Sequence, residues 1–468
     1  MLEQGKIPYE AIDRWIEEHK EQLIEDVKLL SSIKSVSQAQ PENKEEPYGA
    51  GCRQALDAAL GLAKKYGFVV TDYDHYCGTA ILPGETEEQI GFFGHMDVVP
   101  EGTDWNSDPY VPFVDGNYLV GRGTSDNKGP AMAAFYALRC IKELGLPHKH
   151  SGFMFFGCAE ETGMDDILYY RSKTQPPKFS LIPDGFFSVW HGEKGILEGD
   201  LSCDLSGSNL KDFDGGVASN AVPARCSAVL EGVTLEQAKA AFPQEDMTIE
   251  AVENGVKLST TGIAGHAAFP KGTLSAIWKL ADRLAQSGLV TGNGQKAMTF
   301  LQHAFADAYG KGLGIDFEDE DSGKTTHCGG MARVRDGRLV QNINVRYAVT
   351  QDQEQMLANL RRTCEEAGFA VDWLSNDGPA YVPKENPVIP LLNRICEEEL
   401  HQHFEPIVIG GGSYARKLPN AVGCGACQHE NSPYNGGHYP NEAMNITQLY
   451  EALRIYVRIF LELDAFLD

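Results

Sequence analysis

The stretch Phe92-Phe-Gly-His-Met-Asp97 places a histidine and an aspartate directly after a run of apolar residues. A second stretch, Phe155-Phe-Gly-Cys-Ala-Glu-Glu161, repeats the arrangement with two glutamates. Short apolar runs of this kind are typical of buried strands. Open α/β sheets assemble their sites beyond the carboxyl ends of the strands. Together the two stretches predict a buried sheet with these polar side chains gathered at one end.

Helical and strand-like segments alternate on both sides of these stretches. Hydrophobic periodicity predicts helices at residues 9–33, 52–66, 130–144 and 164–172. Apolar runs predict strands at residues 68–70, 79–82, 90–93, 153–156 and 179–182. This alternation is typical of an α/β domain with a mixed, largely parallel sheet flanked by helices.

The pattern changes after residue 187 and returns near Pro387. Between these points the sequence predicts β-rich pieces with helices at residues 234–241, 272–288 and 351–367. Beyond Pro387 it predicts a helix, a strand and a closing helix, at residues 388–402, 406–409 and 441–465. A chain of 468 residues is long enough for two or three domains. We therefore predict a catalytic domain in two parts, interrupted by an inserted α+β lid domain; the parts are residues 1–187, 188–383 (lid) and 384–468.

The composition argues against several classes of function. The chain carries 40 Lys and Arg against 66 Asp and Glu, a formal charge of -26, which repels nucleic acids and anionic membrane surfaces. No apolar run reaches the ~20 residues of a membrane span, and the first residues lack the apolar core of a signal peptide. We therefore expect a cytoplasmic protein that binds neither nucleic acid nor membrane.

The 11 cysteines are scattered at irregular spacings, as expected for reduced thiols rather than a disulfide framework. Cys424 and Cys427 form a CxxC pair, which leaves a redox or zinc-binding role open. The sequence has no second CxxC to complete a four-ligand zinc site, and the residues around the pair are apolar. An isolated pair is a weak indication of function, and we expect this one to belong to a buried strand.

Carboxylates and imidazoles follow several of the predicted strands. The adjacent Glu160 and Glu161 repel each other at a buried strand end unless a cation neutralises them. Asp184 follows another apolar strand, and His438 lies in a Gly-rich turn before the closing helix. With His95 they offer the ligand atoms that divalent metals prefer. The set favours a metal site, although a lone histidine at a strand end more often makes only a hydrogen bond.

Longer motifs surround these residues: Gly94-His-Met-Asp-Val-Val-Pro100, Gly121-Arg-Gly-Thr-Ser-Asp-Asn-Lys-Gly129 and Cys158-Ala-Glu-Glu161. They resemble motifs of the di-zinc exopeptidases of the aminoacylase, carnosinase and succinyl-diaminopimelate desuccinylase clan. Two further motifs look most like the PepV-type dipeptidase branch of that clan, Gly265-His-Ala-Ala-Phe-Pro270 and Gly411-Gly-Ser-Tyr-Ala-Arg416. The resemblance covers essentially the whole chain, with the motifs in order.

The resemblance implies a set of ligands for two zinc ions. Asp126 bridges the ions, although an aspartate just ahead of a helix is also a common helix cap. His95 and Asp184 complete one site, and Glu161 and His438 complete the other. Mn²⁺ or Co²⁺ can replace Zn²⁺ in carboxylate-rich sites. The resemblance also implies a cis peptide bond after Asp126.

Three further residues take catalytic roles from the resemblance. Asp97 orients His95 through its second ring nitrogen, a role that fixes the tautomer of a metal ligand. Glu160 is the general base. His266 stabilises the oxyanion of the tetrahedral intermediate, whereas taken alone it would be an ordinary loop histidine.

The resemblance also implies substrate-binding residues. Asn220 and Arg346 hold the substrate backbone and its terminal carboxylate, a task suited to the guanidinium fork. Gly412 and Ser413 lie in a turn whose backbone amides can cradle a carboxylate. Each has an ordinary alternative, because a lone strand arginine is often a surface ion-pair partner and Gly-rich turns are often only tight loops.

The implied activity is that of a metal-dependent exopeptidase acting on dipeptides or similar small peptides. The long insert resembles the PepV-type lid, which is long enough to supply the oxyanion histidine from the same chain. We therefore expect a monomer-competent enzyme and leave a homodimer open. The alternative is an N-acyl or N-succinyl amino-acid deacylase with the same centre. A non-catalytic metal- or peptide-binding protein is a third class, against which the free carboxylate of Glu160 argues.

Overall fold

The computed structural model describes residues 7–242, 245, 247–428 and 432–467. The chain divides into two compact units. Unit 1 comprises Met1–Gly192, Ala380–Ile407 and Ser413–Asp468, and unit 2 comprises Glu193–Pro379 and Val408–Gly412.

The segment Val408–Gly412 differs from the predicted division, which placed it in the second part of the catalytic domain. It groups with unit 2, where the Lys194 amide donates to the Ile409 carbonyl at 2.8 Å. The guanidinium of Arg346 also donates to the Gly410 carbonyl at 3.0 Å. The Gly-rich turn therefore begins in unit 2 and continues along the chain into unit 1.

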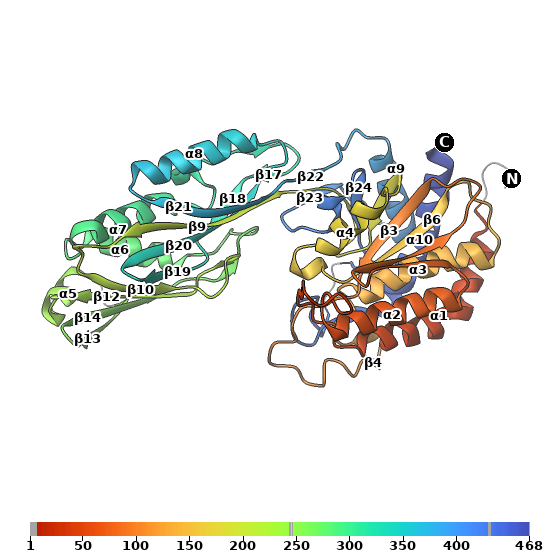
Figure 1. Ribbon diagram of the computed structural model, residues 1–468, viewed down its shortest axis with the longest axis horizontal. Coiled ribbons are helices and arrows are strands. Elements are labelled where there is room, and N and C mark those ends of the chain that lie inside the picture. Colours follow the sequence, from red (N-terminus) through yellow and green to blue (C-terminus); the bar gives the residue numbers. More distant parts are fainter. Residues whose placement is uncertain (1–6, 243–244, 246, 429–431, 468) are drawn as a thin grey trace. The chain divides into compact units, whose positions relative to one another are not determined.

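A mixed sheet forms the centre of unit 1 (Figure 1). Its strands follow one another in the order β1 (Val69–Tyr73), β2 (Cys77–Leu82), β6 (Ser151–Gly157), β3 (Gln89–His95), β7 (Phe179–Ile182), β24 (Ala421–Cys424), β8 (Val189–Glu193) and β22 (Ala380–Tyr381). The central strands β6, β3, β7 and β24 are parallel, and β1, β2 and β8 pair antiparallel to their neighbours. The predicted mixed sheet flanked by helices is confirmed.

Both faces of this sheet are buried. Successive strand residues point to opposite faces, so Phe92 belongs to one apolar core and Phe93 to another. The first core contains side chains of α1 (Tyr9–Ser31), α2 (Ala50–Lys65), α3 (Lys128–Glu143), α9 (Val388–Leu400) and α10 (Ile446–Phe466). The second contains side chains of α4 (Asp165–Lys173) and of the 3-10 turn Tyr414–Lys417. Burial on both faces explains why the strands read as continuous apolar runs.

Unit 1 also contains a small antiparallel sheet. It joins β25 (Ala443–Asn445), β5 (Tyr118–Val120) and β4 (Phe113–Asp115). Because β25 directly precedes α10, this sheet connects the region ahead of α3 to the C-terminal part of the chain.

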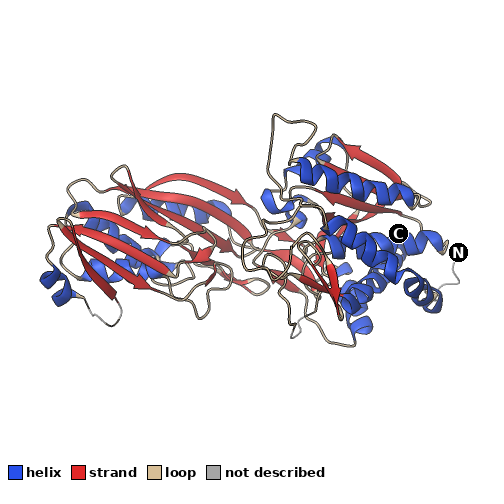
Figure 2. Cartoon of the chain, turned by 90° about the horizontal axis from the view of Figure 1, so that it is seen from below, coloured by secondary structure: helices blue, strands red, loops and turns tan. Residues whose placement is uncertain are grey.

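An antiparallel sheet forms unit 2 (Figure 2). Its order is β13 (Met247–Val252), β14 (Gly255–Thr261), β12 (Arg225–Glu231), β10 (Leu210–Gly215), β19 (Ala332–Arg335), β20 (Arg338–Tyr347), β9 (Gly195–Asp204) and β21 (Ala370–Asp377), and β18 (Thr326–Cys328) also pairs with β20. Buried and more exposed residues alternate along β12 and β14, as expected when only one face is covered. The core of this unit includes side chains of α5 (Leu235–Ala241), α6 (Ala276–Gln286), α7 (Gly292–Ala304) and α8 (Gln353–Glu366).

Helix α7 is absent from the prediction. It begins with Gly292 and Gly294, and glycine is a poor helix former, so the start of the helix carries little local signal. Its buried residues, including Met298 and Leu301, complete the core of unit 2. Tertiary packing therefore stabilises this helix more than local propensity does.

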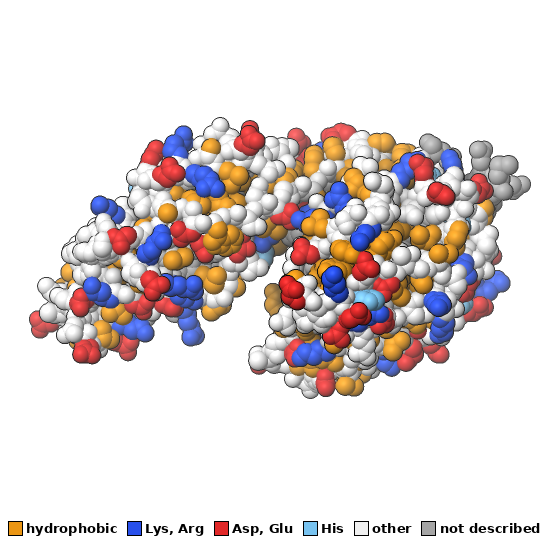
Figure 3. Space-filling model, viewed as in Figure 1, with side chains coloured by type: hydrophobic (Ala, Val, Ile, Leu, Met, Phe, Trp, Pro, Cys, Tyr) orange, Lys and Arg blue, Asp and Glu red, His pale blue; other side chains and the backbone are white. Residues whose placement is uncertain are grey.

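Acidic and basic side chains are interspersed over the visible face of the protein (Figure 3). The acidic surplus of the sequence therefore forms no single patch on that face. In the described part of the chain, no helix combines the length and the apolar character that crossing a membrane requires.

Candidate metal centre

The carboxyl ends of three neighbouring parallel strands carry predicted ligands. His95 is the last residue of β3, Glu161 follows β6 in a short 3-10 turn, and Asp184 comes shortly after β7. Asp126 lies just ahead of α3, and His438 lies in the segment that leads to β25. Parallel pairing brings the strand ends to one edge of the sheet, where the turn before α3 also arrives.

His95, Asp126 and Asp184 form a first group, in which one possible ligand atom of each lies within 4.8 Å of the others. His95 Nε2 lies 3.2 Å from Asp126 Oδ1 and 3.6 Å from Asp184 Oδ2. Nδ1 of the same ring lies 2.9 Å from the Asp97 carbonyl oxygen. A neutral imidazole that donates its proton to this carbonyl presents the Nε2 lone pair to two carboxylates.

Asp126, Glu161 and His438 form a second group with the same spread. His438 Nε2 lies 3.2 Å from Asp126 Oδ2 and 3.1 Å from Glu161 Oε1. Hydrogen bonds to these two carboxylates raise the pKa of His438 to about 11. Asp126 offers one oxygen to each group, the arrangement that a bridging ligand requires. The peptide bond between Asp126 and Asn127 is cis, which confirms that implication of the resemblance.

Glu160 lies beside these groups and forms a third set with His95 and Glu161. Burial raises the pKa of Glu160 well above its ordinary value. Burial, together with the charge of Asp126, raises the pKa of Glu161 to about 7. So many carboxylates in a buried space are ionised together only if cations neutralise them.

The carboxylate of Asp97 makes different contacts from those that the resemblance implies. The hydrogen bond to His95 Nδ1 comes from the Asp97 backbone carbonyl, and the nearest carboxylate oxygen is 3.4 Å away. The carboxylate instead accepts hydrogen bonds from the amides of Glu160 at 3.2 Å and Glu161 at 3.1 Å. Asp97 is therefore placed to hold the backbone of the two glutamates.

Two predicted residues of unit 2, Asn220 and His266, lie at a short strand pair. His266 ends β15 (Gly265–His266), which pairs with β11 (Ala221–Val222) directly after Asn220. The Asn220 carbonyl accepts from the Ala267 amide at 2.9 Å. His266 Nδ1 accepts from the Ala268 amide at 3.1 Å, so a neutral His266 carries its proton on Nε2.

Arg346 lies on β20 and is buried. Its Nε donates to Asn344 Oδ1 at 3.0 Å, and its Nη1 donates to the Gly410 carbonyl. A Cβ atom on Gly410 would lie 2.6 Å from Ala268 Cβ, so the Gly-rich turn runs against the loop of His266. Within unit 2 the structure therefore brings Arg346 and the predicted oxyanion histidine to the same segment.

The last two predicted residues follow along that turn. Gly412 ends the unit 2 segment, and Ser413 begins the last segment of unit 1. The Ser413 side chain is buried and accepts from the Ala415 amide at 3.2 Å, which caps the 3-10 turn after it.

Comparisons with known proteins identify the family. A model of peptidase family M20/M25/M40 matches residues 91–462. The chain belongs to peptidase family M20. Over 458 residues it is 31% identical to "Putative dipeptidase YtjP" of Bacillus subtilis (strain 168), an alignment that covers 95% of this chain and 97% of the relative. This M20 peptidase is accordingly a hydrolase of the metallopeptidase class.

Two solved structures share its fold. Aminoacylhistidine dipeptidase from Vibrio alginolyticus is similar with a TM-score of 0.57 and 13% identity, covering 93% of this chain and 96% of that chain. The Bacillus subtilis YXEP protein, described as a dinuclear metal binding peptidase from the M20 family, has a TM-score of 0.54 and 11% identity, covering 96% of this chain and 99% of that chain.

The side chains of the M20 peptidase fit divalent metal ions. His95 Nε2 is buried and makes no hydrogen bond of suitable geometry in the described part of the chain. A bound cation would satisfy this nitrogen and neutralise the carboxylates around it. Two imidazoles and three carboxylates suit Zn²⁺, Mn²⁺ and Co²⁺ alike. The donor set therefore supports a dinuclear site without selecting the metal.

Glu442 is a buried carboxylate that is absent from the predicted site residues. Its Oε1 accepts from the amides of Ser125 at 2.9 Å and Asp126 at 3.0 Å, and its Oε2 accepts from Arg122 at 2.7 Å. It thereby fixes the backbone of the shared ligand. The one local signal for it is its position shortly after His438, since its partners lie far away in the sequence.

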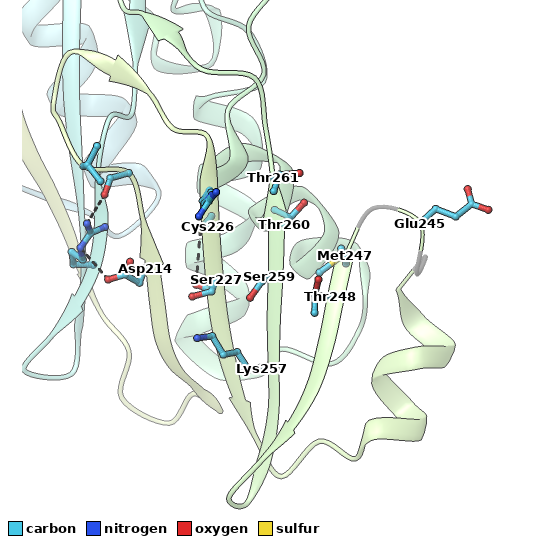
Figure 4. Close-up of a pocket in the computed structure, with 14 residues that line it drawn as sticks. Asp214, Cys226, Ser227, Glu245, Met247, Thr248, Lys257, Ser259, Thr260 and Thr261 are labelled. Atoms are coloured by element: carbon cyan, nitrogen blue, oxygen red, sulfur yellow. Dashed lines mark hydrogen bonds and ion pairs between the residues drawn. The ribbon is translucent and has the colours of Figure 1, made fainter. Parts of the chain in front are cut away.

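A groove of about 550 Å³ in unit 2 contains none of the predicted site residues (Figure 4). Strands β10, β12, β13, β14 and β19 provide most of its walls. Arg333 pairs there with Asp214 at 3.1 Å and donates to the carbonyls of Gly215 and Gly216, so its guanidinium is already engaged. We assign the groove no catalytic role.

The CxxC pair lies partly in the central sheet. Cys424 ends β24 and is fully buried, as expected for a strand residue, and its Sγ lies 3.6 Å from Cys396 Sγ. Cys427 Sγ contacts Ser125 Oγ at 3.7 Å. Burial raises the pKa of Cys427 to about 12, which keeps the thiol protonated and unreactive.

Proposed function

We propose that this M20 peptidase hydrolyses dipeptides and similar small peptides at a centre of two zinc ions. His95 and Asp184 would hold one ion, and Glu161 and His438 would hold the other. Asp126 would bind both ions. The observation that carries the proposal is the shared place of Asp126 in two groups of possible ligands. The dipeptidase names of the Bacillus relative and of the Vibrio structure support the substrate class.

Zinc bound in such a site lowers the pKa of a coordinated water towards ~7 and polarises the scissile carbonyl. Glu160 would accept a proton from the attacking water and return it to the leaving nitrogen. One carboxylate oxygen of Glu160 lies within 4.8 Å of possible ligand atoms of His95 and Glu161. Asp97 would keep this base in position through the amide hydrogen bond to Glu160.

Unit 2 would provide the groups that bind the substrate. His266 would donate from Nε2 to the developing oxyanion, since its Nδ1 already accepts an amide proton. Arg346 would bind the terminal carboxylate of the substrate, and Asn220 its backbone. The backbone amides of Gly412 and Ser413 would contribute further donors to the carboxylate.

Hydrolysis of a mixed dipeptide panel tests the proposal directly. The purified protein is assayed as isolated, after chelation, and after Zn²⁺ or Mn²⁺ is added back, with acetylated and succinylated amino acids in parallel. We expect dipeptide cleavage that chelation abolishes and metal restores. Cleavage of the acylated amino acids alone would instead establish a deacylase, and no cleavage of either class would refute the proposal.

Substitution Glu160→Ala tests the general base. We expect turnover to fall by at least ~100-fold, the scale of a lost proton-transfer group, while two zinc ions per chain remain bound. Turnover and zinc content are measured on the same preparation. Unchanged turnover would refute the role of Glu160, whereas loss of zinc would make it a ligand instead.

A further inference from the structure

The turn that carries Glu160 and Glu161 has its backbone held by two buried carboxylates. Four successive amides donate to them: those of Glu160 and Glu161 to Asp97, and those of Cys158 and Ala159 to Asp166. The distances to Asp166 Oδ2 are 2.6 Å from Cys158 and 3.0 Å from Ala159. Asp97 was predicted from the sequence, whereas Asp166 belongs to no motif described above.

Asp166 is the second residue of α4. Its Oδ1 accepts from the neighbouring Ile167 amide at 2.7 Å. Its Oδ2 faces the other way and accepts the two amides of the turn and, at 2.5 Å, the hydroxyl of Tyr414. The side chain is fully buried, and a carboxylate is buried at high cost unless hydrogen bonds satisfy it.

Tyr414 connects this turn to the segment of Ser413. It is fully buried, and its ring packs edge-on against Phe155 of β6 with centroids 5.4 Å apart. A Cβ atom on Gly157, the last residue of β6, would lie 1.8 Å from the Tyr414 hydroxyl and 2.5 Å from Asp166 Oδ2. The absence of a side chain at Gly157 is therefore what lets the hydroxyl, the carboxylate and the turn meet.

We propose that Asp166 and Tyr414 are positioning residues that fix Glu160 and Glu161 for catalysis and metal binding. They act through the amides of Cys158 and Ala159 and touch neither substrate nor metal. The inference rests on the proposed function, which gives the two glutamates their roles. Outer-shell partners of this kind change metal affinity or activity by ~10–100-fold when they are removed.

Substitution Tyr414→Phe removes one hydroxyl and keeps the ring. Tyr170→Phe is the matched control, because Tyr170 is buried in the same core, packs on Phe155 at 5.5 Å and loses one hydrogen bond, to the Gln175 carbonyl. For Tyr414→Phe we expect kcat to fall by about tenfold with KM within twofold of wild type. We also expect zinc affinity to fall by about tenfold and amides 158–161 to exchange hydrogen at least about tenfold faster.

The control should leave all of these values within about twofold of wild type at a similar melting temperature. Asp166→Asn should exceed the Tyr414→Phe effects, and if it does not fold, Tyr414→Phe alone decides. Wild-type values of kcat, zinc affinity and exchange in Tyr414→Phe, or equal losses in both tyrosine variants, would overturn the inference. If the wild-type protein cleaves no dipeptide, the proposed function fails, while zinc affinity and amide exchange still judge the positioning role.

Discussion

His327 of unit 2 is a buried histidine whose surroundings disfavour its charged form. Its Nε2 lies 3.0 Å from the Asp307 carbonyl oxygen, and its ring packs against Phe305 at 5.5 Å. Burial lowers the pKa of His327 from 6.5 to about 4, although the charge of Asp307 opposes this. Between these pH values the unfolded chain binds more protons than the folded one. The contribution of neutral, buried His327 to the free energy of unfolding is therefore fully present above about pH 6.5 and is lost as the pH falls towards 4.

Replacing His327 with Gln should remove this part of the acid sensitivity. A shift of this size corresponds to a loss of about 3 kcal/mol from the free energy of unfolding between pH 7 and pH 4. Urea unfolding of wild type and variant at both pH values measures it, since carboxylates that titrate in this range contribute equally to both proteins. If both proteins lost the same free energy on acidification, the buried-histidine explanation would be wrong.

At the scale of elements, the segment before β25 must pass very close to the shared ligand. A Cβ atom on Gly437 would lie 2.6 Å from both Cβ and Oδ2 of Asp126, whereas one on Gly436 would meet no atom of the described residues within 4 Å. Neither glycine has a positive φ, so an alanine at either position is free of left-handed backbone strain, and both substitutions restrict the unfolded chain alike. The adjacent pair therefore separates a steric effect on the centre from a general effect on the loop.

We expect Gly437→Ala to displace Asp126 and weaken zinc binding by about tenfold or more, because misplaced ligands lose affinity on this scale. Gly436→Ala should bind zinc as the wild type does. Competition with a chromophoric chelator measures both affinities. Equal affinities in the two variants would show that the approach of Gly437 to Asp126 does not limit metal binding.

At this scale, the sequence predicts the residues that a local pattern marks and does not predict those whose partners lie far away along the chain. His95, Glu161 and Asp184 each end an apolar run, so a local pattern marks them. Glu442 and Asp166 contact backbone amides and side chains that are distant in sequence, at Asp126 and Tyr414 among others. Apart from the position of Glu442 shortly after His438, no local pattern marks such partners. Helix α7 lacks a local pattern for a similar reason, since its stability comes from the core of unit 2.

For the whole molecule, one chain contains every residue that the proposed reaction needs. The metal ligands and Glu160 belong to unit 1, and His266, Asn220 and Arg346 belong to unit 2. We propose that each chain completes its own site and that a monomer is active. The competing arrangement is a dimer in which each chain supplies the oxyanion histidine to the site of its partner.

Mixing two inactive variants distinguishes these arrangements. Glu160→Ala removes the base from the metal centre, and His266→Ala removes the oxyanion donor from unit 2. If each chain uses its own histidine, the mixture has no more activity than the sum of the two variants, because every chain still lacks one group. If the histidine instead acts on the partner subunit, each mixed dimer contains one intact site. Random pairing of equal amounts of the two chains in a symmetric dimer, the commonest oligomer, then restores up to about a quarter of wild-type activity. Co-expression of both variants before purification ensures that the chains can mix, and recovered activity would overturn the single-chain site.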